Sequence, residues 1–149
     1  MPEPAVPREW SQIVLFRTLL LSHASVAQDV KKLLADQCGL SMMQFDMIAE
    51  LGATDGMRMG DLGAKMITSP SSVTRVAQSL EKQGLVKRQR SEESERVVLA
   101  RLTEKGEQFF TEHFLNVASG IATLFDSKLD SDEQQQLGTL LSKLTSLTR

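Results

Sequence analysis

The sequence predicts a mainly α-helical fold with a small β-hairpin wing, and three observations lead to this prediction. Residues 8–37 carry apolar residues at helical spacing over a long stretch. Two local start signals, Ser41 with Gln44 and Ser69-Pro70, mark helix starts in the middle of the chain. Two short strand-like stretches follow them, at residues 85–89 and 97–102. The fold class therefore comes from periodicity and from local start signals.

The first predicted helix, residues 8–37, is apolar on more than one face. Its main stripe is widened by Leu15, Phe16, Leu19 and Leu33. A helix that is apolar on two sides must bury against more than its own small domain. The main stripe consists of Trp10, Ile13, Val14, Leu20, Leu21, Ala24, Ala27, Val30 and Leu34.

The second predicted helix begins at a capping box. Ser41 and Gln44 can satisfy each other's orphan backbone donors, and Leu40 and Phe45 occupy the hydrophobic-staple positions around them. The pattern predicts a helix that runs to about Leu51.

The middle of the chain continues with a very short strand at residues 57–59, a short helix at 61–66 and a helix that starts at Ser69-Pro70. Serine at the N-cap and proline at the first helical position are typical of a helix start. This helix ends at Gly84 and has two different faces. Its apolar stripe is Val73, Val76, Ala77 and Leu80, and its polar face is Ser71, Ser72, Thr74, Arg75, Gln78 and Ser79.

The polar stretch 90–96 joins the two predicted strands of the wing, and two helices follow. Thr103 can cap a helix that reaches about Asp126. Asp130 or Ser131 can cap the last helix. Its apolar stripe is Leu137, Leu140, Leu141, Leu144 and Leu147.

Length and composition limit the possible classes. The chain has 149 residues, 41% of them hydrophobic and 24% charged, which suits one globular domain. A single cysteine rules out an internal disulfide framework and fits a reducing compartment. The longest apolar run is four residues, and the first residues lack the pattern of a signal peptide. We therefore expect a cytoplasmic protein with no membrane partner.

Charge is distributed unevenly along the chain. The whole protein has a net charge of −2. Residues 57–106 hold ten basic and six acidic side chains, a net of +4, whereas the flanks hold seven basic and thirteen acidic ones, a net of −6. A basic middle segment indicates an anionic partner at one surface, and chance scatter of charges is the alternative.

Two short helices with a tight turn, followed by a hairpin, are the order of elements in a winged helix-turn-helix. Short polar side chains let a helix approach base edges, and an arginine can pair bidentately with guanine. The exposed helix N-terminus can accept a phosphate. The alternative is an ordinary solvated helix with a charged hairpin. The candidate DNA contacts are Ser69, Ser71, Ser72, Thr74, Arg75 and Gln78 on the helix, with Arg88, Arg90 and Arg96 on the hairpin.

Residues 62–106 resemble the MarR (multiple antibiotic resistance regulator) family of bacterial transcription factors. The matching stretches are Leu62-Gly-Ala-Lys-Met66, Ser72-Val-Thr-Arg75, Leu80-Glu81, Gly84-Leu-Val86 and Leu102-Thr-Glu-Lys-Gly106, with twenty residues from Lys87 to Gly106. The resemblance implies a homodimer held by residues 8–37 and 107–149, a DNA-binding winged region at 41–106, and a small aromatic or anionic effector. It also implies a pseudo-palindromic operator with half-sites about 34–36 Å apart.

The wing departs from the family pattern at its tip. The family's Asp-x-Arg motif is replaced by Ser94, Glu95 and Arg96, with only the last residue conforming. Glu95 can act as a shifted orienting acid for Arg96, or the wing acids can repel phosphate. The contribution of the wing to binding stays open at this point.

Other residues have competing interpretations. Cys38 lies at a helix end, where a thiolate is disfavoured, so inert packing is preferred over redox sensing. His23 and His113 have no metal-ligand spacing, and no metal or cofactor is expected. Arg17, Met43 and Met47 are candidates for an effector pocket, with an interface contact or core packing as the alternatives.

The sequence thus predicts a DNA-binding regulator, most simply a repressor that a small effector releases from DNA. The alternative is a winged-helix module that binds protein. An enzyme is not expected, because no nucleophile elbow, P-loop or paired carboxylates stand out.

Overall fold

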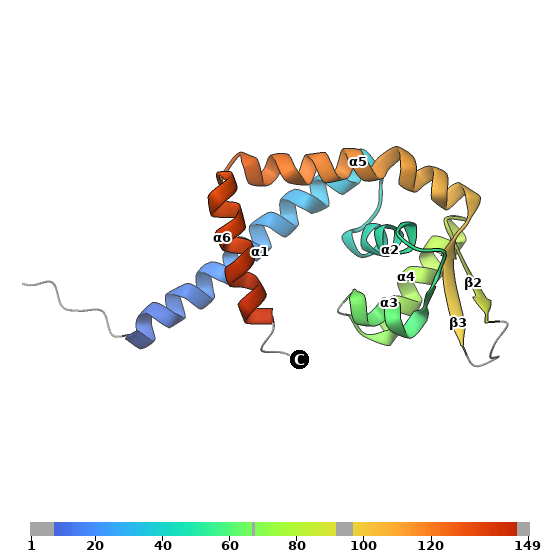
Figure 1. The fold of residues 1–149 in the computed structure, drawn as a ribbon, viewed down its shortest axis with the longest axis horizontal. Helices are drawn as coiled ribbons and strands as arrows, with labels where there is room; N and C mark the ends of the chain where they lie inside the picture. Colours follow the sequence, from blue (N-terminus) through green and yellow to red (C-terminus); the bar gives the residue numbers. More distant parts are fainter. Residues whose placement is uncertain (1–7, 67, 92–96, 146–149) are drawn as a thin grey trace, which may run out of the picture.

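The structure is a computed structural model that describes residues 8–66, 68–91 and 97–145. Within these residues the elements follow the predicted order (Figure 1). They are α1 (Arg8–Gln37), α2 (Met42–Gly52), β1 (Met57–Arg58), α3 (Met59–Lys65), α4 (Pro70–Lys82), β2 (Val86–Arg90), β3 (Val98–Leu102), α5 (Glu104–Asp126) and α6 (Ser131–Thr145). The predicted fold class is confirmed.

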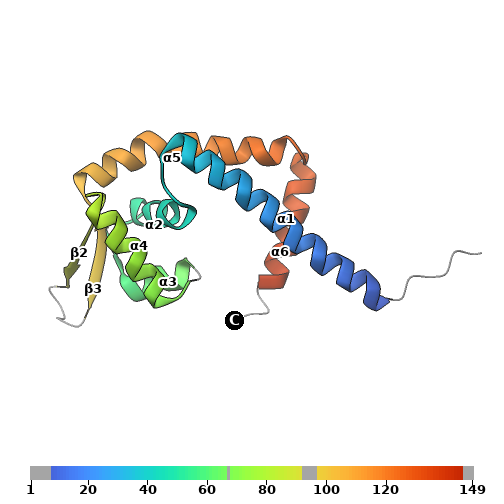
Figure 2. The ribbon, with the colours of Figure 1, turned by 180° about the vertical axis from the view of Figure 1, so that it is seen from behind.

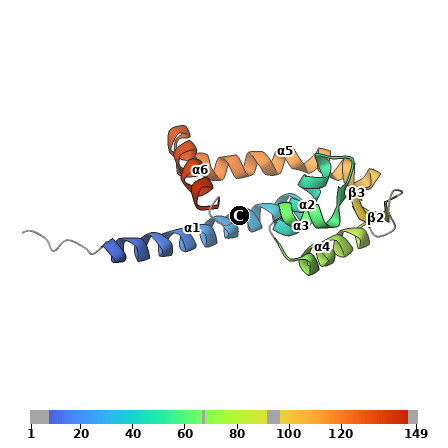
Figure 3. The same ribbon diagram turned by 60° about the horizontal axis from the view of Figure 1, so that its bottom comes forward.

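The long helix α5 connects two parts of the molecule. The winged region, residues 41–106, lies at its N-terminal end, while α6 and the N-terminal half of α1 lie toward its C-terminal end (Figures 1 and 2). Figure 3 shows α4 on the side of the winged region that faces away from α5, with α2 between them. This arrangement places α4 at the outside of the molecule.

Two hydrophobic clusters hold these parts together. The larger one fills the winged region and includes Met47, Leu62 and Leu80. The smaller one joins α1 to α5 through Val30, Leu34 and Val117. Half-buried Cys38 and Phe45 pack against both clusters, so the winged region is fixed to the α1–α5 pair.

The predicted helix starts are confirmed in detail. The Ser41 hydroxyl accepts a hydrogen bond from the Gln44 N–H, and the Gln44 side chain accepts one from the Ser41 N–H at 2.9 Å. Ser69 caps α4, and the hydroxyl of Thr103 caps α5. Of the two alternatives for α6, the Asp130 carboxylate accepts the Glu133 N–H at 2.9 Å and is the cap.

The strands form one antiparallel sheet in the order β1–β3–β2. Val86 lies opposite Leu102, and Met57 lies opposite Ala100, so the very short first strand extends the predicted hairpin to three strands. The predicted helix at 61–66 starts earlier, at Met59, because the chain turns into the helix directly after β1. The other predicted boundaries agree to within about two residues.

The N-terminal half of α1 and all of α6 leave apolar side chains exposed. Helix α6 contributes no buried residue within its bounds. By length and composition alone, α1 could cross a membrane, which the short apolar runs of the sequence did not indicate. The exposed apolar residues of the two helices are Trp10, Ile13, Val14, Leu15, Phe16, Leu19, Leu20, Leu21, Leu137, Leu140, Leu141 and Leu144.

Candidate nucleic-acid interface

Helix α4 presents a buried apolar face and an exposed polar face. Val73, Ala77 and Leu80 are almost completely buried in the core of the winged region. Arg75 and Gln78 are exposed, and Arg75 forms no ion pair with any described residue. Because the apolar stripe fixes the rotation of the helix about its axis, Arg75 and Gln78 point away from the protein.

Three serine hydroxyls cluster at the N-terminus of α4. The Ser69 hydroxyl accepts the Ser72 N–H at 3.2 Å, and the Ser71 and Ser72 hydroxyls lie 3.0 Å and 2.9 Å from it. Pro70 occupies the first turn, where its missing N–H costs nothing. Ser69 and Ser71 are exposed, so this helix end offers hydroxyls and the positive pole of the helix dipole to an anion.

Thr74 is half-buried and is only partly available to a partner. Its hydroxyl donates to the Pro70 carbonyl at 3.0 Å, one turn back along the same helix. The hydroxyl hydrogen of Thr74 is therefore already used within the helix, and its methyl group remains available for contact with a partner. An apolar contact with the thymine methyl group is one of the ways in which threonine contacts a base pair.

Helix α2 supports α4 through a single amide. The Gln44 carboxamide oxygen caps α2, and its nitrogen donates to the Ser79 hydroxyl at 2.9 Å. The capping box that the sequence predicts thus also fixes α4. Ser79, which belongs to the predicted polar face, is half-buried against α2.

Arg88 differs from the prediction that it contacts DNA. Its guanidinium donates to the Glu81 carboxylate at 2.8 Å, and its backbone N–H donates to the other carboxylate oxygen at 3.0 Å. The hydrogen bonds and charge of Arg88 hold the pKa of Glu81 below its usual range. Arg88 therefore joins β2 to α4, and it is not a free cation for phosphate.

The rest of the wing is described only in part. Arg90 is exposed at the end of β2. Arg96, together with Ser94 and Glu95, lies outside the described residues.

Comparisons with known proteins agree with this geometry. The MarR family model matches residues 40–98. The transcriptional regulator YkoM of Bacillus subtilis is 30% identical over 105 residues, which cover 70% of this chain and 68% of YkoM. The chain belongs to the MarR family.

One further relative and one solved structure match nearly the whole chain. The transcriptional repressor MprA of Escherichia coli K12 is 27% identical over 139 residues, 92% of this chain and 78% of MprA. Sco3205, a MarR family regulator of Streptomyces coelicolor solved in complex with DNA, has the same fold, with a TM-score of 0.84 and 18% identity over 97% of this chain and 91% of Sco3205. The protein is a transcriptional regulator and not an enzyme.

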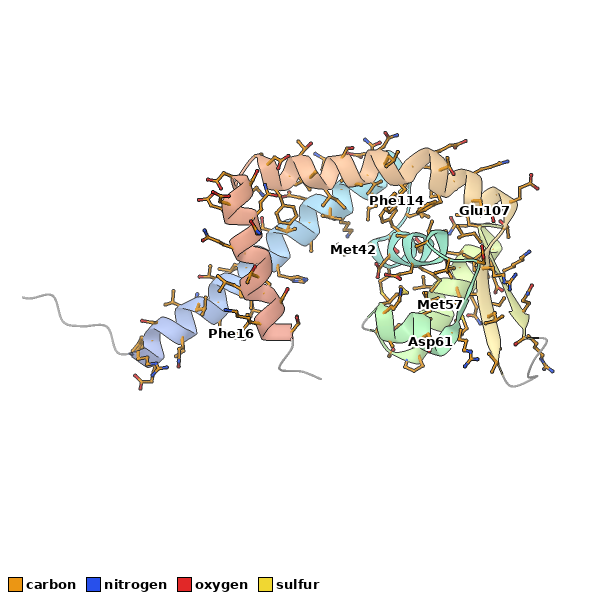
Figure 4. The ribbon with its side chains drawn as sticks, viewed as in Figure 1. Phe16, Met42, Met57, Asp61, Glu107 and Phe114 are labelled. Atoms are coloured by element: carbon orange, nitrogen blue, oxygen red, sulfur yellow. The ribbon has the colours of Figure 1, made fainter. Side chains whose placement is uncertain are left out.

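In this MarR-family chain Arg17, on α1, lies apart from Met43 and Met47, which share one side of α2. Met47 is completely buried in the core of the winged region, so for this residue the core-packing alternative holds. Met43 is half-buried on α2, and Arg17 is exposed on α1. Figure 4 shows their labelled neighbours, Met42 and Phe16, in separate parts of the molecule.

The remaining candidates play packing or surface roles among the described residues. The Cys38 thiol donates to the Leu34 carbonyl at 3.3 Å and packs against both cores, as the packing interpretation expects. His113 contacts the Phe109 ring, with ring centroids 4.4 Å apart. Among the described residues, no three His, Cys, Asp or Glu side chains lie together as a metal site would need.

Two features of the wing were missed by the sequence reasoning. Glu81 was not considered as a partner of Arg88, although both lie in the family-like stretch. Lys87 and Arg101 lie directly opposite each other on the other face of the sheet. This pair can be recognised only from the strand register. If one strand were shifted by one residue, its side chains would turn to the core face and the pair would not form.

Proposed function

We propose that the protein is a homodimeric, DNA-binding repressor that recognises a pseudo-palindromic operator and is released from it by a small effector. The exposed polar face of α4 is the observation that carries the proposal: Arg75 forms no ion pair with a described residue, and the apolar stripe behind it is buried. Such a face suits the major groove, where arginine distinguishes guanine. The DNA complex of the similarly folded Sco3205 and the repressor function of MprA support it.

Within this proposal the α4 residues divide by chemistry. Arg75 and Gln78 pair with base edges, and the methyl group of Thr74 contacts thymine. The Ser69, Ser71 and Ser72 hydroxyls hold a backbone phosphate at the helix N-terminus. On the wing, Arg90 and Arg96 contribute contacts that carry affinity rather than base choice.

The exposed apolar faces of α1 and α6 support the homodimer. A second copy of these helices would cover residues that this chain leaves in solvent, and burial of apolar area stabilises the association. Burial in the proposed dimer would explain why α1 is long and apolar, so that no membrane is needed to explain it. A two-fold axis would then set two α4 helices about 34–36 Å apart, one turn of DNA. We place the protein in the cytoplasm, where its proposed DNA target is accessible.

The DNA proposal is tested by selecting bound fragments from the source genome and titrating the best one. We expect Arg75→Ala to remove sequence-specific binding, a loss of about 1–3 kcal/mol for one bidentate pair. Lys82→Ala, an exposed cation in the last turn of the same helix, is the matched control. We expect Arg96→Ala to weaken all sequences alike and to reduce the salt dependence of binding by about one phosphate contact. Equal affinity of wild type and Arg75→Ala would refute the assignment, and absence of any salt-dependent DNA binding would favour the protein-binding module.

The dimer is tested separately by sedimentation of the full chain. A homodimer has twice the chain mass of 16.5 kDa. We expect Leu141→Glu to produce monomers, because the change places a charge on the exposed apolar face of α6. Gln135→Glu, on the opposite side of the same helix, should leave the dimer intact. A monomeric wild type would contradict the two-fold arrangement.

A further inference from the structure

A cleft lies on the side of the winged region away from the proposed DNA-contacting helix. It has a volume of about 910 Å³, within the range of small-molecule sites. Its walls come from the end of α2 and the connection to β1, from the outer face of the wing, and from the first turns of α5. Figure 4 shows Glu107 on α5 above the upper end of the sheet.

Two cations line this cleft from the wing. Lys87 of β2 and Arg101 of β3 are direct partners across the strands, and like charges in such positions destabilise a sheet. The stem of Arg101 folds over Gly56, where an added Cβ would lie 2.6 Å from the arginine Cγ. The Arg101 Nε is buried and has no hydrogen-bond partner among the residues that the structure describes. A buried donor without a partner costs free energy.

Two carboxylates line the same cleft from its other walls. Asp55 belongs to the connection between α2 and β1, and Glu107 belongs to α5. None of these four charged side chains forms an ion pair with any described residue. The lining thus has no net charge but carries its cations on the strands and its acids on the loop and the helix. The exposed part of Phe110 adds an apolar wall.

We propose that this cleft binds a small zwitterion of the α-amino-acid class. Its carboxylate lies between Arg101 and Lys87, and its ammonium group lies toward Asp55 and Glu107. A simple anion would meet repulsion from the two acids, whereas a zwitterion complements both sets of charges. The terminal N–H groups of an arginine donate bidentately to a carboxylate.

The location links the ligand to regulation. The cleft joins the wing to α5, the helix that connects the winged region to the C-terminal helices. A ligand held by both elements would bias their relative position, provided that it binds two arrangements with different affinity. This consequence for operator affinity rests on the proposed function, whereas the binding itself does not.

The test measures binding to the full chain in the absence of DNA. The twenty free amino acids are screened by thermal shift, and the best one is titrated by calorimetry beside its analogues that lack the carboxylate or the ammonium group. We expect saturable binding of one amino acid per chain, with both analogues about ten- to a hundredfold weaker, as loss of a charge-assisted hydrogen bond predicts. No binding of any amino acid up to about 10 mM would overturn the proposal, and so would equal binding of all three compounds.

Variants locate the site. We expect Arg101→Gln and Glu107→Gln each to weaken binding by about tenfold or more. Arg58→Gln is the matched control, because Arg58 is an exposed cation on the same sheet that does not line the cleft. Thermal unfolding checks each fold, and exposed Lys87→Gln replaces Arg101→Gln if the latter does not fold. Equal weakening by Arg58→Gln, or none by the cleft variants, would overturn the site. Operator titration is read separately, so failure of DNA binding and failure of this site give different results.

Discussion

The contact between Glu81 and Arg88 predicts a measurable coupling between α4 and the wing. We consider Glu81→Gln, Arg88→Met and the double variant. Glu81→Gln keeps an acceptor for the Arg88 backbone N–H but removes the charge, and Arg88→Met keeps most of the stem volume. The double-variant cycle then isolates the interaction between the two side chains.

The size of the coupling follows from exposure and geometry. The side chains of Arg88 and Glu81 are 26% and 29% exposed, so the pair lies between a surface ion pair and a buried one. Its side-chain hydrogen bond measures 2.8 Å, which is typical of a charge-assisted N–H···O bond. A surface pair contributes about 0–1 kcal/mol and a hydrogen bond to a charged group about 1.5–3 kcal/mol. We therefore expect a coupling of about 1–2 kcal/mol at neutral pH.

The same contact predicts how stability depends on pH. Arg88 lowers the pKa of Glu81 from its ordinary value of 4.5 in the folded protein. The stabilisation is therefore fully present above pH 4.5 and is lost as the pH falls through the lowered pKa. Wild type and Glu81→Gln should accordingly differ at pH 7 and converge in acid.

The coupling energy is measured by urea unfolding of wild type, the two single variants and the double variant at one fixed protein concentration. Titration of each protein with operator DNA measures the effect on binding. We expect each single variant to weaken operator binding, because the wing that carries Arg90 would no longer be held against α4. A coupling near zero at pH 7 would refute the reasoning. A difference between wild type and Glu81→Gln that stays unchanged down to about pH 2 would refute it as well.

Two further predictions concern stability. A Cβ at Gly106 would collide with the backbone carbonyl of Leu85, so Gly106→Ala should lower the free energy of unfolding in urea by about 3 kcal/mol. The control is Gly138→Ala, whose Cβ meets open space and should not destabilise the chain. Equal stability of the two variants would contradict this packing. Partial desolvation of its carboxylate, and then the charge of Glu50, raise the pKa of Asp46, although the residue as a whole is exposed. Asp46→Asn should therefore stabilise the protein at pH 7, and the gain should disappear as the pH falls through the raised pKa toward 3.8, so a gain that persists at lower pH would exclude the charge as its cause.

Features that depend on a few neighbouring residues could be predicted from the sequence. The capping box at Ser41 and Gln44, the start at Ser69-Pro70 and the cap at Thr103 all involve contacts within three residues. Short-range hydrogen bonds require no knowledge of the tertiary fold. The rotation of α4 about its axis was equally predictable, because its apolar stripe must be buried, and it packs in the core between α2 and the sheet.

Features that depend on tertiary distance could not be predicted in this way. Met47 and Met43 lie four residues apart on α2, yet one is fully buried and the other half-buried. Periodicity indicates that both face the same side of the helix, but not how much space the neighbouring elements leave there. Burial of Met47 favours the core-packing alternative for this residue, and the effector pocket stays a prediction. Arg17 is exposed on α1 and forms no ion pair with a described residue, so its alternatives stay open.

The wing shows why counting basic residues did not separate their roles. Arg88 and Lys87 are consecutive in β2, so their side chains point to opposite faces of the sheet. Arg88 faces α4 and is neutralised by Glu81, whereas Lys87 faces the cleft opposite Arg101 and has no partner among the described residues. The net charge of +4 for residues 57–106 therefore does not act at one surface. Part of it holds the wing against α4, and part is available to a ligand on the other face, so the DNA-binding affinity of the winged region must come from fewer cations than the sequence contains.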